Sequence, residues 1–228
     1  MEETNMVGDG DAATTNVQSP VVTFVNRLQK LREQERWGDL AALRRAAGTF
    51  LGESAAAMQQ FYRLLPLQVT KPWEEEIYYL VATLFDLNRE EPPKPRGDWD
   101  MVNFGATMRE CKARSEKAAS RTTTDDKKGT GKKNESQKDE SRESSIDKRF
   151  SALLESSIET GELAYRLRQL VRLAASKEIG VNWGTLLDDL LWWGHEAKRV
   201  QKRWARSYYG EQRPISAPDV FTDEPGGA

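Results

Sequence analysis

Residues 144–210 read SSIDKRFSALLESSIETGELAYRLRQLVRLAASKEIGVNWGTLLDDLLWWGHEAKRVQKRWARSYYG, and this stretch decides the fold. Its apolar residues recur three and four positions apart, the spacing that places side chains on one face of an α-helix. Three stripes follow one another: Phe150, Leu153, Leu154 and Ile158; Leu163, Leu167, Leu170, Val171 and Ala174; Leu186, Leu187, Leu190 and Leu191. Asn182 is placed to cap the third helix. The pattern predicts a C-terminal bundle of helices.

A fourth predicted helix follows a bend near Gly194 and carries two different faces. Its apolar face comprises Trp193, Ala197, Val200, Trp204 and Tyr208, within about 80° of arc. Its basic face comprises Lys198, Arg199, Lys202, Arg203 and Arg206. One acid, Glu196, opposes these five, so the local balance is +4 in a chain with a net charge of −2. Such a face is typical of polyanion binding, although a solvated helix surface shows the same pattern.

The first half of the chain also shows helical periodicity. Phe24, Leu28 and Leu31 mark a helix that begins near Pro20. Further helical segments follow around residues 40–47, 61–65 and 73–88, and β-strand alternation with hairpin signals is not convincing anywhere. The predicted fold class is therefore all-α, with two small helical bundles joined by a long flexible linker.

Composition divides the chain into five segments. Residues 1–19 and 211–228 are polar and are predicted to be a disordered N-terminal tail and a flexible C-terminal tail. Residues 20–111 and 146–210 are the predicted N-terminal and C-terminal bundles. Between them, 112–145 holds only three apolar residues, all alanine, among ten Lys or Arg and seven Asp or Glu. Such a segment cannot bury enough surface to offset its chain entropy, which predicts a low-complexity linker.

The single cysteine, Cys111, excludes an internal disulfide framework and a multi-cysteine zinc site, and it fits a reducing compartment. No apolar run approaches the 18 residues of a membrane span, and the N-terminus has no basic and apolar leader. We therefore expect a cytoplasmic protein without a membrane association.

Catalytic arrangements are not evident either. Any Ser-His-Asp or Cys-His site would need His195, the only histidine. The string GTGKK at 129–133 lacks the first glycine and the final Ser or Thr of a phosphate loop. Asp188 and Asp189 point about 100° apart on a helix, and we expect both on its solvated side. The sequence therefore predicts a non-enzyme without metal or cofactor.

Six motifs occur in a defined order: AALRR (Ala41–Arg45), QFYRLLP (Gln60–Pro66), NFG (Asn103–Gly105), SIDKRFSALL (Ser145–Leu154), LRQLVRL (Leu167–Leu173) and VNWGTLLDDLLWWG (Val181–Gly194). Each is short, but the ordered set resembles the small subunit of the type I-E CRISPR surveillance complex Cascade, the CasB family. The resemblance spans the chain apart from its tails and linker.

This resemblance implies a non-enzymatic subunit built from two helical bundles. In that family two copies sit within the complex beside the other Cascade protein subunits. The partners implied are CRISPR RNA, target DNA and a second copy of the chain. The implied role is to stabilise the guide RNA–target DNA R-loop and its displaced strand, because base pairing supplies the sequence specificity and the protein need only hold phosphates.

The resemblance also suggests nucleic-acid-binding residues. The positions matching basic residues of the family are Arg45, Lys148, Arg149 and Arg168, and we add their neighbours Arg44 and Arg172. Gln169 stands where relatives can carry another basic residue, and His195 with Glu196 replaces a basic pair. We expect Lys198, Arg199, Lys202, Arg203 and Arg206 to restore that charge further along.

Two other classes of function are compatible with the same patterns. A free-standing helical DNA- or RNA-binding regulator would need a short three-helix unit with a basic recognition helix, and none is evident. A protein-only helical adaptor would use the apolar stripes and leave the arginines solvated.

Overall fold

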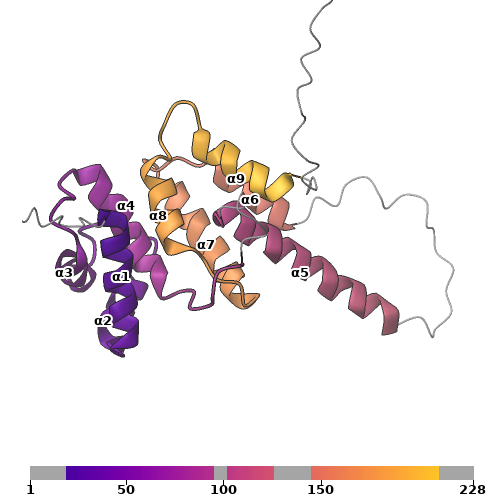
Figure 1. Cartoon of the computed structure of the whole chain (residues 1–228), viewed down its shortest axis with the longest axis horizontal. Helices are drawn as coiled ribbons and strands as arrows, with labels where there is room; N and C mark the ends of the chain where they lie inside the picture. The colour runs from indigo at the N-terminus through magenta and orange to yellow at the C-terminus, as the bar shows by residue number, and fades with distance from the viewer. Residues whose placement is uncertain (1–18, 95–101, 126–144, 211–228) are drawn as a thin grey trace, which may run out of the picture.

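The computed structural model describes residues 19–94, 102–125 and 145–210, and these contain α-helices and no strand (Figure 1). The helices are α1 (Pro20–Glu33), α2 (Trp37–Arg45), α3 (Ala55–Leu64), α4 (Pro72–Phe85), α5 (Phe104–Asp125), α6 (Ser145–Glu155), α7 (Glu162–Ser176), α8 (Trp183–Leu191) and α9 (Arg199–Tyr209). The all-α prediction is confirmed. The predictions for residues 1–18, 126–144 and 211–228 lie outside the described residues.

Local signals in the sequence explain where several helices begin. Pro20 and Pro72 occupy the first turns of α1 and α4, where their missing N–H would have no helical partner. Asn182 caps α8, because its side-chain oxygen accepts a hydrogen bond from the Thr185 N–H at 3.1 Å. The predicted cap on this helix is therefore confirmed.

The buried side chains of the N-terminal helices α1–α4 and of the C-terminal helices α5–α9 form one continuous hydrophobic core. The residues from Ile77 to Phe85 are all buried in α4. A helix that is buried on every side needs neighbours all round, and α4 packs against α7 and α8 as well as against α2 and α3. Phe85 meets Trp183 of α8 with 5.5 Å between ring centroids, and the Asn88 amide donates to the Ile179 carbonyl at 2.8 Å. The two groups are therefore joined through the core as well as along the chain.

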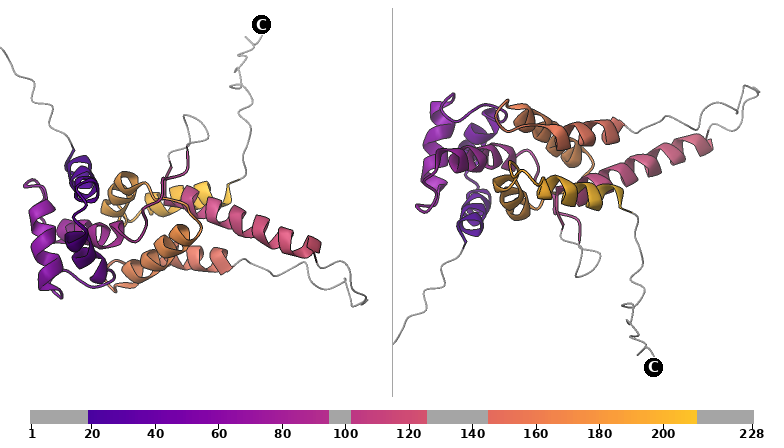
Figure 2. Two further views of the ribbon diagram at one scale, coloured as in Figure 1. Left: turned by 90° about the horizontal axis from the view of Figure 1, so that it is seen from below. Right: turned by 90° about the horizontal axis from the view of Figure 1, so that it is seen from above.

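The first part of the segment predicted as a linker is helical. Residues 112–125 continue α5, whose far end projects from the rest of the molecule (Figures 1 and 2). The near end of α5 packs against α9, α7 and α6, and Lys112 forms an ion pair with Asp147 of α6 at 2.9 Å. Residues 104–111, predicted as part of the N-terminal bundle, therefore pack with the C-terminal helices. Alanine, lysine and arginine favour a helix even where little apolar surface is buried.

Cys111 lies on the packed side of α5 and is fully buried. Burial raises the pKa of its thiol to about 12, so the thiol stays protonated until the pH approaches that value. At about pH 8.5, where an ordinary cysteine is half ionised, we expect iodoacetamide to modify the folded protein more than about a hundredfold slower than the urea-unfolded chain. Mass spectrometry of timed samples measures both rates. Equal rates in the two states would contradict the burial of this thiol.

Candidate nucleic-acid interface

The last helix of the described residues, α9, presents the basic face predicted for it. Val200, Trp204 and Tyr208 are buried on its inner side. The basic residues Lys198, Arg199, Lys202, Arg203 and Arg206 are all exposed. The amphipathic pattern therefore predicted the orientation of this helix correctly.

The chain turns between α8 and α9 and does not continue as a helix. Lys198 has a left-handed φ of 47° immediately before α9 begins at Arg199. The bend expected near Gly194 is confirmed, but the burial expected for Ala197 is wrong, because Ala197 lies in this turn and is exposed. His195 is exposed in the same turn, and its Nδ1 accepts a hydrogen bond from the Ala197 N–H at 3.2 Å.

Asp189 holds α9 against α8. The expectation that it lies on a solvated surface is wrong, because its side chain is only 1% exposed. Its carboxylate accepts a hydrogen bond from the Trp204 indole N–H and forms an ion pair with Arg203. A buried indole N–H needs an acceptor, and a buried carboxylate needs a counter-charge. Arg203 therefore has a structural contact in addition to its exposed charge.

A shallow hollow of about 240 Å³ lies between α6 and α7. It is lined by Arg149 from α6 and by Tyr165, Arg166, Gln169 and Leu170 from α7. Two arginines from different helices thus border one depression in the surface. Arg166 was not among the predicted residues, although its position three residues before Gln169 places both on neighbouring parts of one helix face.

Asp147 positions the basic residues at the start of α6. Its carboxylate is buried and accepts hydrogen bonds from the Tyr208 hydroxyl at 2.7 Å and the Lys112 ammonium at 2.9 Å. Burial, together with the bond to Asp147, raises the pKa of Tyr208. These contacts fix α6 against α5 and α9, and the next two residues, Lys148 and Arg149, are exposed.

Arg168 faces a different part of the molecule from Arg149. A Cβ atom on Gly48, in the turn after α2, would lie 3.3 Å from the Arg168 Nη1 atom. Arg168 is therefore half-buried where the N-terminal and C-terminal helices meet. Arg172, one turn further along α7, is exposed.

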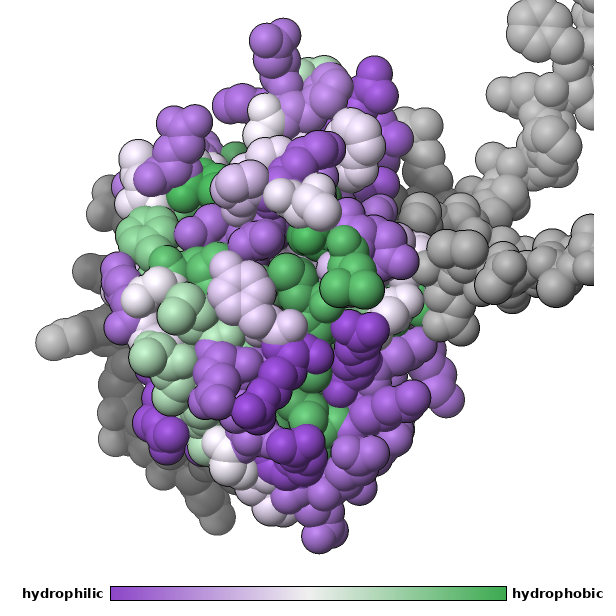
Figure 3. All heavy atoms as spheres, turned by 90° about the vertical axis from the view of Figure 1, so that its left-hand side faces the viewer, coloured by the Kyte–Doolittle hydropathy of each residue, from purple (hydrophilic) through white to green (hydrophobic). Residues whose placement is uncertain are grey.

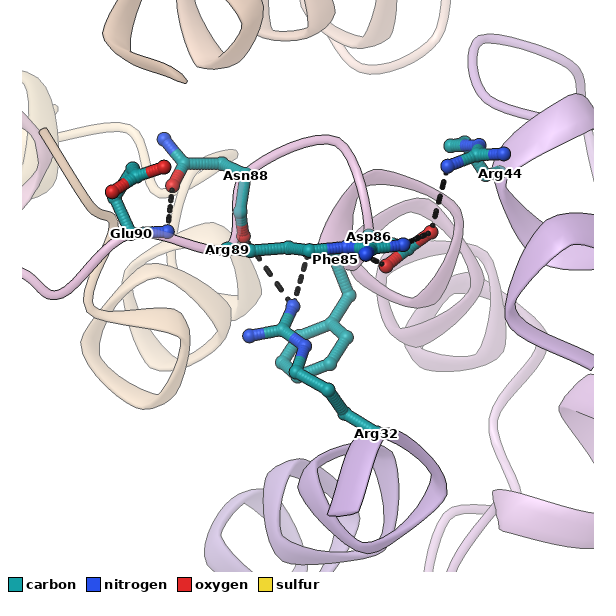
Figure 4. A network of polar contacts seen from close by, with 7 residues as sticks. All are labelled: Arg32, Arg44, Phe85, Asp86, Asn88, Arg89 and Glu90. Atoms are coloured by element: carbon teal, nitrogen blue, oxygen red, sulfur yellow. Dashed lines mark hydrogen bonds and ion pairs between the residues drawn. The ribbon is translucent and has the colours of Figure 1, made fainter. Parts of the chain in front are cut away.

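Asp86, directly after α4, pairs with two arginines, and Arg32 of α1 lies close to them (Figure 4). Its carboxylate accepts hydrogen bonds from Arg44 Nη1 at 3.0 Å and Arg89 Nε at 2.7 Å. The Asp86 side chain is 2% exposed, whereas Arg44 and Arg89 are 44% and 46% exposed. Arg32 donates to the Phe85 carbonyl at 3.1 Å, and burial lowers its pKa. This cluster closes the end of α4 and holds two guanidinium groups at the surface.

The structure therefore distributes the predicted basic residues over several surfaces. Lys148 and Arg149 lie on α6, Arg168 and Arg172 on α7, and the longest series on α9. Arg44 joins the Asp86 cluster, and its neighbour Arg45 is exposed. Arg89 was not among the basic residues that the sequence analysis named. Its spacing of three residues from Asp86 could have indicated the ion pair between them.

Catalytic and membrane features can be assessed over the described part of the chain. Within it, no three His, Cys, Asp or Glu side chains come together as metal ligands. Among the same residues, no helix is both long enough and apolar enough to cross a membrane.

The fold and the surface define an all-α protein with several exposed basic faces, in which Arg44, Arg89 and Arg203 pair with buried carboxylates. The family model of the CRISPR-associated protein Cse2 matches residues 39–209. A CRISPR-associated protein Cse2 from Thermus thermophilus is 33% identical over 193 residues, covering 84% of this chain and 91% of the relative. The chain belongs to the CRISPR-associated protein Cse2 family.

Solved structures agree with this assignment. A Cse2-family protein from Thermus thermophilus has a TM-score of 0.60 and 30% identity, covering 85% of this chain and 100% of that one. CasB from M. ruber has a TM-score of 0.57 and 28% identity, covering 84% and 93%. A chain of a CRISPR RNA-guided surveillance complex shares the fold, with a TM-score of 0.55 and 23% identity. The match covers 83% of the present chain and 91% of that chain.

Proposed function

We propose that this protein is a non-catalytic, cytoplasmic subunit of a type I-E CRISPR surveillance complex. In this proposal it stabilises the R-loop formed by the guide RNA and the target DNA, and also the displaced strand. Its partners are CRISPR RNA, target DNA, the other protein subunits and a second copy of itself. Membership of the Cse2 family supports the assignment to such a complex. The arrangement of basic side chains supports the proposed contacts to nucleic acid.

The observation that carries the proposal is the hollow bordered by Arg149 and Arg166. Two planar guanidinium groups around one depression suit a phosphate, which accepts paired hydrogen bonds from arginine. Gln169 lines the same hollow, and Arg166, three residues before it in α7, supplies a positive charge there.

Contacts of this kind are independent of sequence. Phosphates carry the charge of nucleic acid but none of its base identity, and guide pairing supplies specificity in such a complex. Exposed guanidinium groups held by buried carboxylates, such as Arg44 beside Asp86, suit this task because they lose little side-chain freedom on binding.

The test is the lifetime of target DNA on the assembled complex. In the variant Arg45→Glu/Arg149→Glu/Arg172→Glu we expect faster release of target DNA. We also expect the log–log slope of affinity against salt to fall by up to about 3, which is about 1 for each phosphate that the variant no longer binds. These three side chains are exposed, so their replacement leaves the core intact. Half-buried Arg168 is avoided for the same reason.

The matched control is Lys30→Glu/Arg63→Glu/Lys94→Glu, which removes the same charge from exposed positions of the N-terminal half. We expect target DNA to be released from this complex as slowly as from the wild type. An R-loop lifetime that is unchanged in the first variant would overturn the proposed contacts. A sharp sequence preference of the isolated protein would favour a regulator instead.

A further inference from the structure

A groove crosses the surface where α4 meets the loops before α7 and α9. It consists of two adjoining hollows of about 420 Å³ and 300 Å³. Trp73, Ile77, Ile158 and Glu159 line both hollows, which makes them one continuous feature. The function proposed above does not use this groove.

The floor of the groove is apolar and partly open to solvent. Trp73 is 51% exposed and Phe50 is 49% exposed. The Phe50 ring lies over Gly161, which precedes α7. A Cβ atom added to Gly161 would be 3.0 Å from the Phe50 ring. Exposed aromatic side chains of this kind mark interaction surfaces. On the face that Figure 3 shows, the left-hand side of Figure 1, hydrophobic patches also reach the surface between hydrophilic residues.

The rim of the groove is acidic. Glu155, Glu159 and Glu196 are exposed. Within the described residues none of these three carboxylates forms an ion pair, whereas Lys198 is the one Lys or Arg residue that lines either hollow. This charge repels nucleic acid and attracts Lys or Arg side chains.

Gln201 adds an unused hydrogen-bond acceptor. Its side chain lines the larger hollow and is 8% exposed. Its Nε2 donates to the Trp193 carbonyl at 2.8 Å, but its Oε1 is buried and accepts no hydrogen bond in the described part of the protein. A buried acceptor without a partner is destabilising.

The tails of this chain do not fit the groove by charge. Residues 1–18 carry four acids and no basic residue, and residues 211–228 carry four acids and one arginine. Like charges would therefore meet at the rim. The occupant must bring positive charge and at least one bulky apolar side chain.

We propose that this groove docks a segment of another protein subunit in which Lys or Arg residues flank bulky apolar side chains. The apolar side chains would cover Trp73 and Phe50, and the basic residues would meet the rim glutamates. The inference rests on the proposed function only in placing the chain within a complex of protein subunits.

The first experiment measures how tightly the full-length chain binds a complex assembled without it. In the variant Glu155→Lys/Glu159→Lys/Glu196→Lys, like charges meet at the rim, so we expect the affinity to fall by at least about tenfold. The control Glu33→Lys/Glu90→Lys/Glu116→Lys makes the same charge change at exposed glutamates outside the groove. We expect the control to bind like the wild type.

Equal affinities of the two variants would overturn the groove proposal. The affinity of each isolated variant for a single-stranded DNA of about 20 nucleotides is measured in parallel. Because both variants gain the same charge, we expect equal DNA binding. A failure of the groove proposal can therefore be distinguished from a failure of the proposed R-loop contacts, which the arginine variants test.

The second experiment identifies the occupant. A carbodiimide joins carboxylates directly to lysine amines, and mass spectrometry of the assembled complex locates the joined residues. We expect Glu155, Glu159 or Glu196 to be joined to a lysine of a neighbouring subunit, within a segment that also carries bulky apolar residues. Absence of such links, or links to lysines of this chain alone, would contradict the proposal.

Discussion

Replacing Trp204 with alanine is expected to lower the free energy of unfolding by about 3–5 kcal/mol. Trp204 is the largest fully buried side chain among the described residues. Its ring centroid lies 4.9 Å from that of Trp193 and 5.2 Å from that of Phe104 in α5. The change leaves a cavity between α8, α9 and α5, and it also removes the indole donor from the buried Asp189 carboxylate.

Urea denaturation followed by circular dichroism measures this effect. Trp192→Ala is the matched control, because it removes the same side chain from a position that is 60% exposed. We expect the control to change the free energy of unfolding by no more than about 0.5 kcal/mol. Similar losses in both variants would show that Trp204 does not fill the core as the structure indicates.

Gly105→Ala is expected to destabilise the protein by about 1–3 kcal/mol or more, although alanine favours a helix. Gly105 lies at the crossing of α5 and α9. A Cβ atom there would overlap the Trp204 carbonyl oxygen and lie 2.9 Å from the Trp204 Cα atom. Because backbone atoms on both sides cannot move aside, α5 and α9 would have to separate.

Gly38→Ala provides the matched control, since Gly38 is also helical and a Cβ atom there would meet nothing within 4 Å. Only the gain in helix propensity operates at that position, so we expect stabilisation by up to about 1 kcal/mol. Thermal unfolding of both variants gives the comparison. A Gly105→Ala variant that gained stability like the control would contradict the close helix crossing.

Periodicity predicted most of the fold because amphipathic helices carry their burial pattern locally. The spacing of Val200, Trp204 and Tyr208 by itself indicates the inner face of α9. The start of α9 was not predictable in the same way. Ala197 continues the apolar spacing, but the left-handed backbone at Lys198 ends that register one residue before the helix begins.

Residue type predicted exposed charge better than it predicted pairing. Exposure of Arg45, Lys148 and Arg149 follows from their place opposite the apolar stripes. Asp189 looked like half of a solvated acidic pair, yet it is buried against Arg203 and Trp204. The partners of a buried carboxylate come from another helix, and local spacing carries no information about them.

The amino-acid sequence by itself determined the helical class, the faces of the helices and the family to which the chain belongs, because these depend on spacing along the chain and on short ordered motifs. Only the tertiary structure decided which side chains meet. It placed Arg166 beside Arg149, Asp86 between Arg44 and Arg89, and the acidic groove between α4 and two distant loops. Such sets form when helices far apart in the chain pack against one shared core, and that packing depends on the shapes of all the buried side chains together.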